Sequence, residues 1–149
     1  AVKVINDADA AGIAEMTFGA GRKHKGVVLI ATVGTGIGTA LFYNKQLLPN
    51  TELGHIEING KIAEHYASDA VRQSKDLSFK KWGKRLSQYL IKMEKLFWPE
   101  LIIIDGGLVK KYDKIEPYLT TNAPIVAAKT GNEAGMIGAA VYARQSLYC

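Results

Sequence analysis

The sequence predicts an α/β domain in which helices flank a mixed sheet. Two segments dominated by continuous apolar runs, residues 26–31 and 101–105, are typical of buried strands, and the second has the character of a parallel strand. Segments with helical spacing alternate with these strands, which indicates an α/β arrangement. A hairpin that turns at Asn44 and Lys45 adds antiparallel pairing. The sheet is therefore expected to contain both kinds of strand neighbour.

Helical and strand patterns follow one another along the chain. Residues 3–5 are interpreted as the end of a strand, and Asn6 or Asp7 is suited to cap the helix expected over residues 8–21. Capping is the structural explanation for Asp7, and a functional role is the alternative. The other expected elements, in order, are strands 26–31, 38–43 and 46–48, helices 63–72 and 78–97, strand 101–105, helix 109–119, strand 123–127 and helix 134–143.

Residues 78–97 carry the clearest helical pattern. Apolar side chains recur every three to four residues and form one stripe, while most of the basic residues lie on the other positions. The stripe consists of Phe79, Trp82, Leu86, Leu90, Met93 and Phe97. We expect the stripe to pack in the core, with a dimer interface as the alternative, and the basic residues to form a solvated helix face.

Composition limits the class of protein. The 149 residues suffice for one domain, and 48% hydrophobic with 22% charged residues indicate a soluble globular chain. No apolar run approaches the roughly 20 residues that span a bilayer, so we expect a cytoplasmic protein. The single cysteine, Cys149, excludes an internal disulfide. A net charge of +5 favours anionic partners such as nucleotides, polyphosphate or nucleic acid without choosing among them.

A glycine- and threonine-rich run, residues 32–39, joins a buried strand to the next strand. Glycines let backbone N–H groups converge on an anion, and threonine hydroxyls add donors around the same point. The spacing Gly-x-Gly-x-Gly between strands differs from the dinucleotide-binding pattern, which opens a helix. A glycine-rich hairpin without a ligand is the alternative for this run. The predicted phosphate-binding residues are Thr32, Gly34, Thr35, Gly36 and Gly38.

The loop of residues 49–58 is a second candidate for function. Glu52, His55 and Glu57 fall within six residues, between proline and glycine positions that are typical of a functional loop. Such a cluster can accept hydrogen bonds from sugar hydroxyls or bind a metal. Hydrogen bonding is favoured, because metal sites usually gather more nitrogen or sulfur ligands than one histidine.

Four motifs in order, residues 4–12, 34–38, 52–55 and 64–68, resemble the ROK family of sugar kinases and sugar-responsive repressors. The resemblance covers essentially the whole chain, and residues 48–57 are most similar to the polyphosphate-dependent glucokinase branch. It implies the two-lobed actin and hexokinase fold, with residues 1–149 forming the carboxy-terminal lobe. The implied reaction is transfer of a phosphoryl group from polyphosphate or ATP to the 6-hydroxyl of glucose.

The resemblance also implies a role for individual residues. Asp7 matches the catalytic base that accepts the proton of the attacking hydroxyl, and Gly106 and Gly107 match the turn beside the phosphoryl donor. The glycines of residues 34–38 match the second phosphate loop. Mg²⁺ is expected with the donor, and the expected partners are glucose or mannose, polyphosphate or ATP, and a second copy of the chain, with no nucleic acid and no membrane. The implied sugar contacts are Asn6, Glu52, His55 and Glu64.

Three departures from the family pattern carry expectations of their own. The chain lacks the cysteine-rich zinc motif of many members, so no structural zinc is expected and His55 should bind sugar only. Leu108 follows Gly106 and Gly107 where a third glycine and then a small polar residue are usual, which leaves the donor open. The amino-terminal lobe with its Asp-x-Gly-Gly-Thr phosphate loop is absent. We therefore expect a piece of a longer protein with little or no turnover alone.

A non-catalytic relative is the rival interpretation. ROK-type sugar-responsive regulators and sugar-binding modules share the sugar loop but can lose the base, so the presence of Asn6 and Asp7 favours the kinase. A DNA-binding helix pair ahead of Ala1 would favour the regulator instead.

Overall fold

The computed structural model describes residues 2–145 and contains the mixed sheet that the sequence predicts. Its five strands have the order β3-β2-β1-β6-β7. β1 pairs antiparallel with β2 and parallel with β6, β2 pairs antiparallel with β3, and β6 pairs parallel with β7. The strands are β1 (Val27–Val33), β2 (Ile37–Tyr43), β3 (Gln46–Leu48), β6 (Leu101–Asp105) and β7 (Ile125–Ala127). Ala1 and Cys149 lie outside the described residues.

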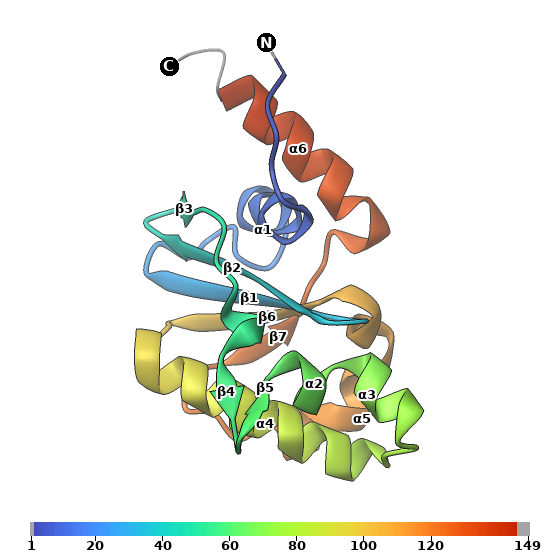
Figure 1. Ribbon diagram of the computed structural model, residues 1–149. Helices are drawn as coiled ribbons and strands as arrows, with labels where there is room; N and C mark the ends of the chain where they lie inside the picture. Colours follow the sequence, from blue (N-terminus) through green and yellow to red (C-terminus); the bar gives the residue numbers. More distant parts are fainter. Residues whose placement is uncertain (1, 146–149) are drawn as a thin grey trace.

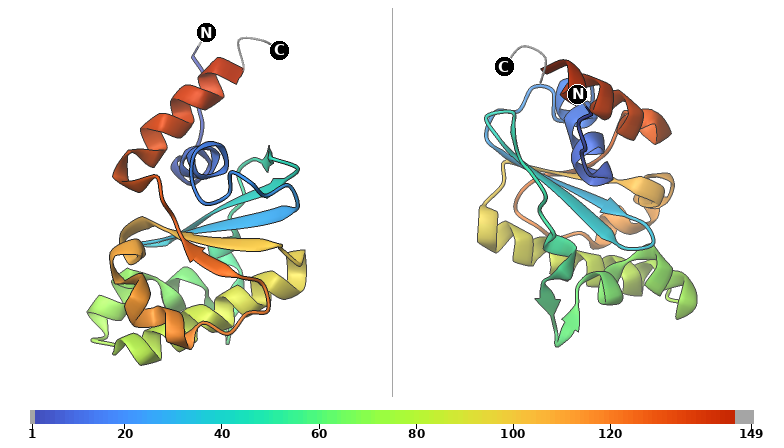
Figure 2. Two further views of the ribbon diagram at one scale, coloured as in Figure 1. Left: turned by 180° about the vertical axis from the view of Figure 1, so that it is seen from behind. Right: turned by 45° about the horizontal axis from the view of Figure 1, so that its top comes forward.

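Helices cover both faces of this sheet (Figure 1). α1 (Asp7–Thr17) and α6 (Ala134–Gln145) lie on one face, and Figure 2 shows from behind that residues 2–6 run beside α6. The opposite face is covered by α2 (Glu64–Ala67), α3 (Asp69–Ser74), α4 (Phe79–Phe97) and α5 (Tyr112–Ile115). The short elements are β4 (Glu57–Ile58), β5 (Lys61–Ile62), and the 3₁₀ turns η1 (Leu53–His55), η2 (Gly106–Lys111), η3 (Glu116–Tyr118) and η4 (Gly131–Glu133).

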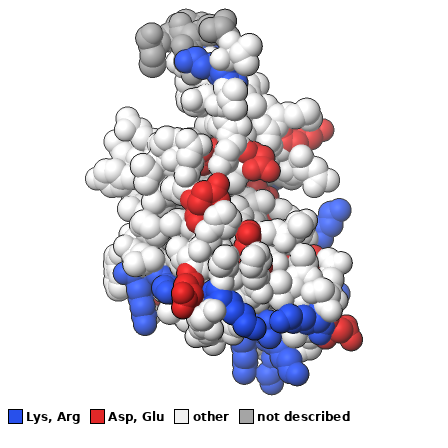
Figure 3. Space-filling view, in the orientation of Figure 1, with Lys and Arg blue, Asp and Glu red and all other residues white. Residues whose placement is uncertain are grey.

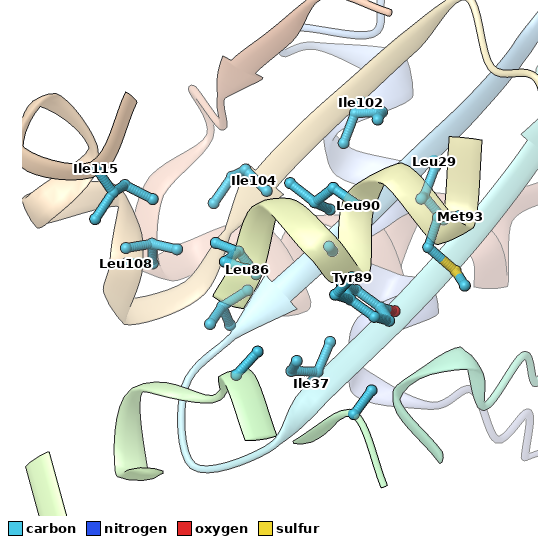
Figure 4. Packing of buried hydrophobic residues seen from close by; sticks show 14 of the residues in the cluster. Leu29, Ile37, Leu86, Tyr89, Leu90, Met93, Ile102, Ile104, Leu108 and Ile115 are labelled. Carbon is cyan, nitrogen blue, oxygen red and sulfur yellow. The ribbon is translucent and has the colours of Figure 1, made fainter. Parts of the chain in front are cut away.

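Large apolar side chains fill the space between α4 and the sheet (Figure 4). Trp82, Leu86, Leu90 and Met93 have no exposed surface, so the predicted stripe of α4 packs in the core. The Trp82 indole N–H also donates to the carbonyl oxygen of Ala67 at 2.8 Å. The alternative in which this stripe forms a dimer interface is therefore wrong. The lysines of α4 are exposed, as a solvated face requires.

On the opposite face of the sheet, small residues bring backbones together beside a smaller cluster of large apolar side chains. A Cβ at Gly12 would lie 2.7 Å from the Cβ of Ala40 and 2.8 Å from the Phe42 ring, so only glycine allows α1 this close to β2. A Cβ at Gly138 would overlap the carbonyl oxygen of Ala10, where α6 crosses α1. Close contact of these backbones fixes α1, which carries the predicted catalytic base.

Several expected boundaries are wrong, for identifiable reasons. Residues 3–5 form no strand with the sheet but run beside α6, and α1 ends at Thr17 instead of residue 21. The expected helix 63–72 divides at Ser68, whose extended backbone and hydroxyl start α3 by accepting from the Val71 N–H. The expected helix 109–119 consists of η2, α5 and η3, and Pro117 removes a helical N–H there.

Other expectations are confirmed. Asn44 and Lys45 adopt positive φ angles of 50° and 63°, which is the two-residue turn that the hairpin needs. The segment between β1 and β2 joins two strands, as expected. Among the helices of residues 2–145, none combines the length and the apolar character needed to cross a membrane.

Candidate active site

A cavity of about 620 Å³ opens where α1, the ends of β1 and β6, and the start of α6 meet. It brings together four of the predicted site residues, which are separated by up to 100 positions in the sequence. These are Asp7, Thr32, Gly106 and Gly107. Lys110, Ala128, Asn132 and Gly135 line other parts of its wall.

Asp7 stands at the first turn of α1 with an exposed side chain. Asn6 is the residue that caps the helix, because its Oδ1 accepts from the Asp9 N–H at 2.8 Å. Asp7 Oδ1 accepts from the N–H of Ala8 at 2.8 Å. A Cβ at Gly38 would lie only 3.1 Å from the Ala8 Cβ, so Gly38 permits the start of α1 to rest against β2. The capping explanation thus applies to Asn6, and the Asp7 carboxylate lies at the cavity.

Asp105 is a cavity residue that the sequence analysis missed. It is buried at the end of β6, and its Oδ1 accepts from the Gly106 N–H at 2.7 Å. Burial raises the pKa of Asp105, the Gly106 hydrogen bond opposes this, and the nearby Glu15 carboxylate adds to the rise. The sequence does contain a signal for Asp105, because a charged residue ends an otherwise apolar strand directly before two glycines.

The glycine turn after Asp105 comes close to β1. Gly106 has a φ of +83°, and a Cβ there would lie 2.9 Å from the Val33 carbonyl oxygen. A side chain at this position would therefore be strained and crowded. Within residues 2–145, the buried Thr32 hydroxyl oxygen makes no hydrogen bond, and Thr32 lines the cavity nearby. The turn thus brings bare backbone and one free hydroxyl to the same wall.

Glu52, His55 and Glu64 form a second cluster, as the sequence analysis expects. The His55 Nε2 lies 3.5 Å from Glu64 Oε1 and 3.9 Å from Glu52 Oε2. His65, which the sequence analysis did not select, places its Nε2 3.7 Å from the same Glu64 oxygen. Acidic side chains gather in the middle of this face, between α1 and α2 (Figure 3). Three acceptor groups on one exposed surface suit a polyhydroxyl ligand.

Glu64 connects this cluster to the glycine run. Its Oε2 accepts from the Ile37 N–H at 3.3 Å, and a Cβ at Gly36 would lie 2.5 Å from the same oxygen. The run itself is closed by the Gly34 N–H, which donates to the Gly36 carbonyl oxygen at 3.0 Å. One carboxylate thus touches the predicted sugar residues with one oxygen and the predicted phosphate loop with the other.

Asp69 forms a corresponding connection on the side of the predicted donor turn. It is buried and accepts hydrogen bonds from the Arg72 Nε and the Lys111 Nζ, at 2.8 and 2.9 Å. Burial opposes ionisation of Asp69, but the hydrogen bonds from Arg72, Lys111 and Gln73 lower its pKa overall. The adjacent Ala70 N–H donates to the Gly34 carbonyl oxygen at 3.2 Å. α3 therefore links the Gly34 loop to η2.

The predicted phosphate residues do not share one hollow. Thr32 lines the 620 Å³ cavity, whereas Gly34, Thr35 and Gly36 border two shallower hollows of about 480 and 510 Å³ beside α3. Gly38 lies beneath the start of α1. Within residues 2–145, no group of three or more His, Cys, Asp or Glu side chains has the arrangement of a metal site.

Similarity to known proteins identifies the family of this chain. The model of the ROK family matches residues 1–76, which is half of the chain and includes Asp7, the glycine run and the Glu52–Glu64 cluster. The chain belongs to the ROK family. The resemblance seen in the four sequence motifs is thereby confirmed.

Individual ROK relatives are similar over nearly the whole chain. The polyphosphate glucokinase of Mycobacterium tuberculosis (strain CDC 1551 / Oshkosh) is 46% identical over 140 residues, covering 94% of this chain and 53% of that protein. The crystal structure of an inorganic polyphosphate/ATP-glucomannokinase from Arthrobacter sp. strain KM is 48% identical with a TM-score of 0.94, covering 97% of this chain and 57% of that one. The chain thus spans about half the length of these relatives.

A more distant relative shares the fold. A ROK family glucokinase from Streptomyces griseus, solved with glucose and AMPPNP, is 25% identical with a TM-score of 0.80, covering 97% of this chain and 68% of that one. The expectation of an actin- and hexokinase-like lobe with a mixed sheet flanked by helices is therefore confirmed.

Proposed function

We propose that residues 1–149 are the carboxy-terminal lobe of a glucokinase that transfers a phosphoryl group from polyphosphate or ATP to the 6-hydroxyl of glucose, with mannose as a second acceptor. One observation carries the proposal: the exposed Asp7 carboxylate and the Gly106–Gly107 turn line the same cavity. Identity of 46% and 48% to a polyphosphate glucokinase and a polyphosphate/ATP-glucomannokinase supports it.

The acceptor side uses carboxylates and an imidazole. Glu52 and Glu64 would accept hydrogen bonds from sugar hydroxyls, and His55 would complete this set. Because the Asn6 Oδ1 already caps α1, its amide N–H groups are the part available to a sugar oxygen. Asp7 would accept the proton of the 6-hydroxyl as that oxygen bonds to phosphorus and the bond to the leaving phosphate breaks. Fixed acceptors of this kind reject analogues that leave them unpaired.

The donor side uses backbone and small residues. Phosphoryl transfer depends mainly on positioning and charge stabilisation, so a rigid glycine-lined wall is appropriate. The cavity also fits a Mg²⁺ that arrives with the donor, because Asp7, Asp105 and Thr32 bring side-chain oxygens to it and Mg²⁺ usually takes one or two carboxylates with the substrate phosphates. Asp105 and the Thr32 hydroxyl would hold it, and the ion would neutralise developing charge on the phosphates.

The complete protein is proposed to have two lobes. An amino-terminal lobe would supply the first phosphate loop and close the open side of the cavity, so residues 1–149 alone should turn over little or no glucose. We further propose that the complete protein is cytoplasmic and forms a homodimer. Light scattering would test the dimer. Robust glucose phosphorylation by residues 1–149 alone would contradict the assignment as one lobe.

The decisive test is Asp7→Asn in the two-lobed protein, assayed by coupled glucose phosphorylation. Loss of the base should lower turnover by about 10²–10⁴-fold, while glucose binding measured by calorimetry is kept. Asp113→Asn, on the exposed part of α5, is the matched control and should retain full turnover. Near-normal turnover of Asp7→Asn would show that Asp7 is not the base.

A further inference from the structure

Glu15 is a fully buried carboxylate that the reaction does not use. It lies on α1 two turns after Asp7, with no exposed surface. Its Oε1 accepts from the N–H groups of Lys129 and Thr130, at 2.8 and 2.6 Å, and from the Thr130 hydroxyl. Its Oε2 accepts from the Ala20 N–H at 2.8 Å. A buried carboxylate needs such donors, because burial without them is strongly unfavourable.

The segment that Glu15 holds forms one wall of the cavity. Lys129 and Thr130 lie between β7 and η4, and their neighbours Ala128, Gly131 and Asn132 line the cavity. Asp7 and Ala8 line the same cavity, on the helix that carries Glu15. One carboxylate therefore joins the helix that carries Asp7 to the Lys129–Thr130 segment, over 115 positions of sequence.

Packing of the two helices does not depend on this carboxylate. α6 crosses α1 at Gly138 and Ala10, where the backbones touch without any side chain between them. Glu15 acts instead on the loop that precedes α6. Three of its hydrogen bonds go to that loop, and they involve donors in different directions. A charged acceptor shared by several donors specifies one loop position more narrowly than apolar packing does.

We propose that Glu15 is a positioning residue that sets the distance between Asp7 and the donor-side wall. It touches neither substrate, and it acts on phosphoryl donor binding through the Lys129–Thr130 segment. The sugar cluster of Glu52, His55 and Glu64 lies on other elements, and Asn6 caps α1 at the end away from Glu15, so glucose binding should change much less than donor binding. This inference rests on the proposed kinase function, because it assigns the cavity to the donor.

Thr130 provides a test that leaves the Glu15 side chain in place. In the two-lobed protein, Thr130→Val removes the hydroxyl donor but keeps the side-chain shape, whereas Thr130→Ser keeps the hydroxyl. Calorimetry with ATP, tripolyphosphate and glucose would give the three dissociation constants. Thr130→Val should raise the dissociation constant of the preferred phosphoryl donor by about tenfold, because a hydrogen bond to a charged group is lost. The affinity for glucose should change less than about twofold. Thr130→Ser should restore donor affinity.

Glu15→Gln should lower the affinity for the phosphoryl donor at least as much, since it replaces a carboxylate oxygen by an NH₂ group that cannot accept a hydrogen bond. Glu100→Gln is the control, because that exposed carboxylate pairs with His24 away from the cavity. Three results would each overturn the proposal. The first is equal loss of donor and glucose affinity in Thr130→Val, and the second is an unchanged dissociation constant for the donor. The third is a Thr130→Ser variant whose donor affinity is as low as that of Thr130→Val.

Absence of turnover in the unsubstituted protein would refute the kinase function alone, while the ratios of dissociation constants still decide the role of Glu15. Binding of neither donor nor glucose would overturn both.

Discussion

The two faces of the sheet are built differently. Beneath α4, large side chains such as Trp82, Tyr89 and Leu86 fill the space, and the buried Asp69 is paired with cations. Beneath α1 and α6, alanines and glycines bring backbones into direct contact beside a smaller cluster of large apolar side chains, and the buried Asp9 and Glu15 accept from backbone N–H groups. The α4 face provides most of the buried apolar volume. The α1 face, which carries Asp7, is the one on which small displacements would move the candidate site.

The largest expected effect belongs to the α4 face. Trp82→Ala removes a fully buried ring and its hydrogen bond to Ala67, so the free energy of unfolding should fall by about 4 kcal/mol. Trp98→Ala is the matched control, since Trp98 is 76% exposed, and should change the unfolding free energy by less than about 0.5 kcal/mol. Urea unfolding followed by far-ultraviolet circular dichroism measures both. Similar losses in the two variants would show that burial of Trp82 is not what stabilises this face.

On the α1 face, adding a single methyl group should change the free energy of unfolding. Gly138→Ala places a Cβ against the Ala10 backbone and should destabilise by about 1–3 kcal/mol through overpacking. Gly135→Ala, on the same helix, meets nothing within 4 Å and should be neutral or stabilising by up to about 1 kcal/mol, because alanine favours helices.

The same unfolding assay compares the two variants, and turnover of the two-lobed protein adds a second readout. Gly138→Ala should lower turnover because it shifts the helix that carries Asp7. If Gly138→Ala and Gly135→Ala have equal stability, close backbone contact between α1 and α6 is not required for the stability of this face.

Asp69 should have a smaller and pH-dependent effect. Its pKa is lowered in the folded state, so its contribution to stability is present above the unfolded pKa near 3.8 and is lost as the pH falls through the folded value. Asp69→Asn should therefore cost about 2 kcal/mol at pH 7, since its charged hydrogen bonds are weakened. Urea unfolding at pH 7 and near pH 3.5, with Asp113→Asn as the exposed control, would measure this. The cost should be smaller near pH 3.5 than at pH 7, and an undiminished cost at the lower pH would contradict an ionic role.

The contrast between the faces also explains what the sequence could predict. The stripe of α4 and the runs of β1 and β6 depend on local periodicity, and their burial was predicted correctly. Asp7, Glu52, His55 and Glu64 could be selected because family motifs mark them. Asp105 and Glu15 were missed, because their roles depend on partners that the fold brings together from distant positions, such as Thr130. No spacing in the sequence links Glu15 to Thr130.

Helix boundaries failed for a related reason. The division at Ser68 depends on a side-chain cap whose geometry the periodicity of residues 63–72 does not contain. Residues 3–5 have strand-like composition but no strand partner, because α6 occupies the adjacent space. Local pattern therefore located the elements, whereas side-chain caps and tertiary contacts decided where they end.

The smallest expected effect has the opposite sign and belongs to Asp9. Its Oδ2 accepts from the Asn50 N–H at 2.9 Å, while within residues 2–145 its buried Oδ1 makes no hydrogen bond. Burial raises the pKa of Asp9, the Asn50 hydrogen bond opposes this, and Glu52 and Asp7 add to the rise. A raised carboxyl pKa favours the protonated form, so Asp9 supports folding fully below the unfolded pKa near 3.8, and that support is lost as the pH rises through the folded value.

Asp9→Asn keeps an acceptor for Asn50 and removes the buried charge, so it should raise the unfolding free energy at pH 7 by on the order of 1 kcal/mol. The gain should shrink towards pH 3.5, in the direction opposite to Asp69→Asn. Urea unfolding of both variants at the two pH values tests the comparison directly. If Asp9→Asn is destabilising at pH 7, the ionised carboxylate is itself required to hold Asn50, and the α1 face then depends on charge as much as the α4 face does.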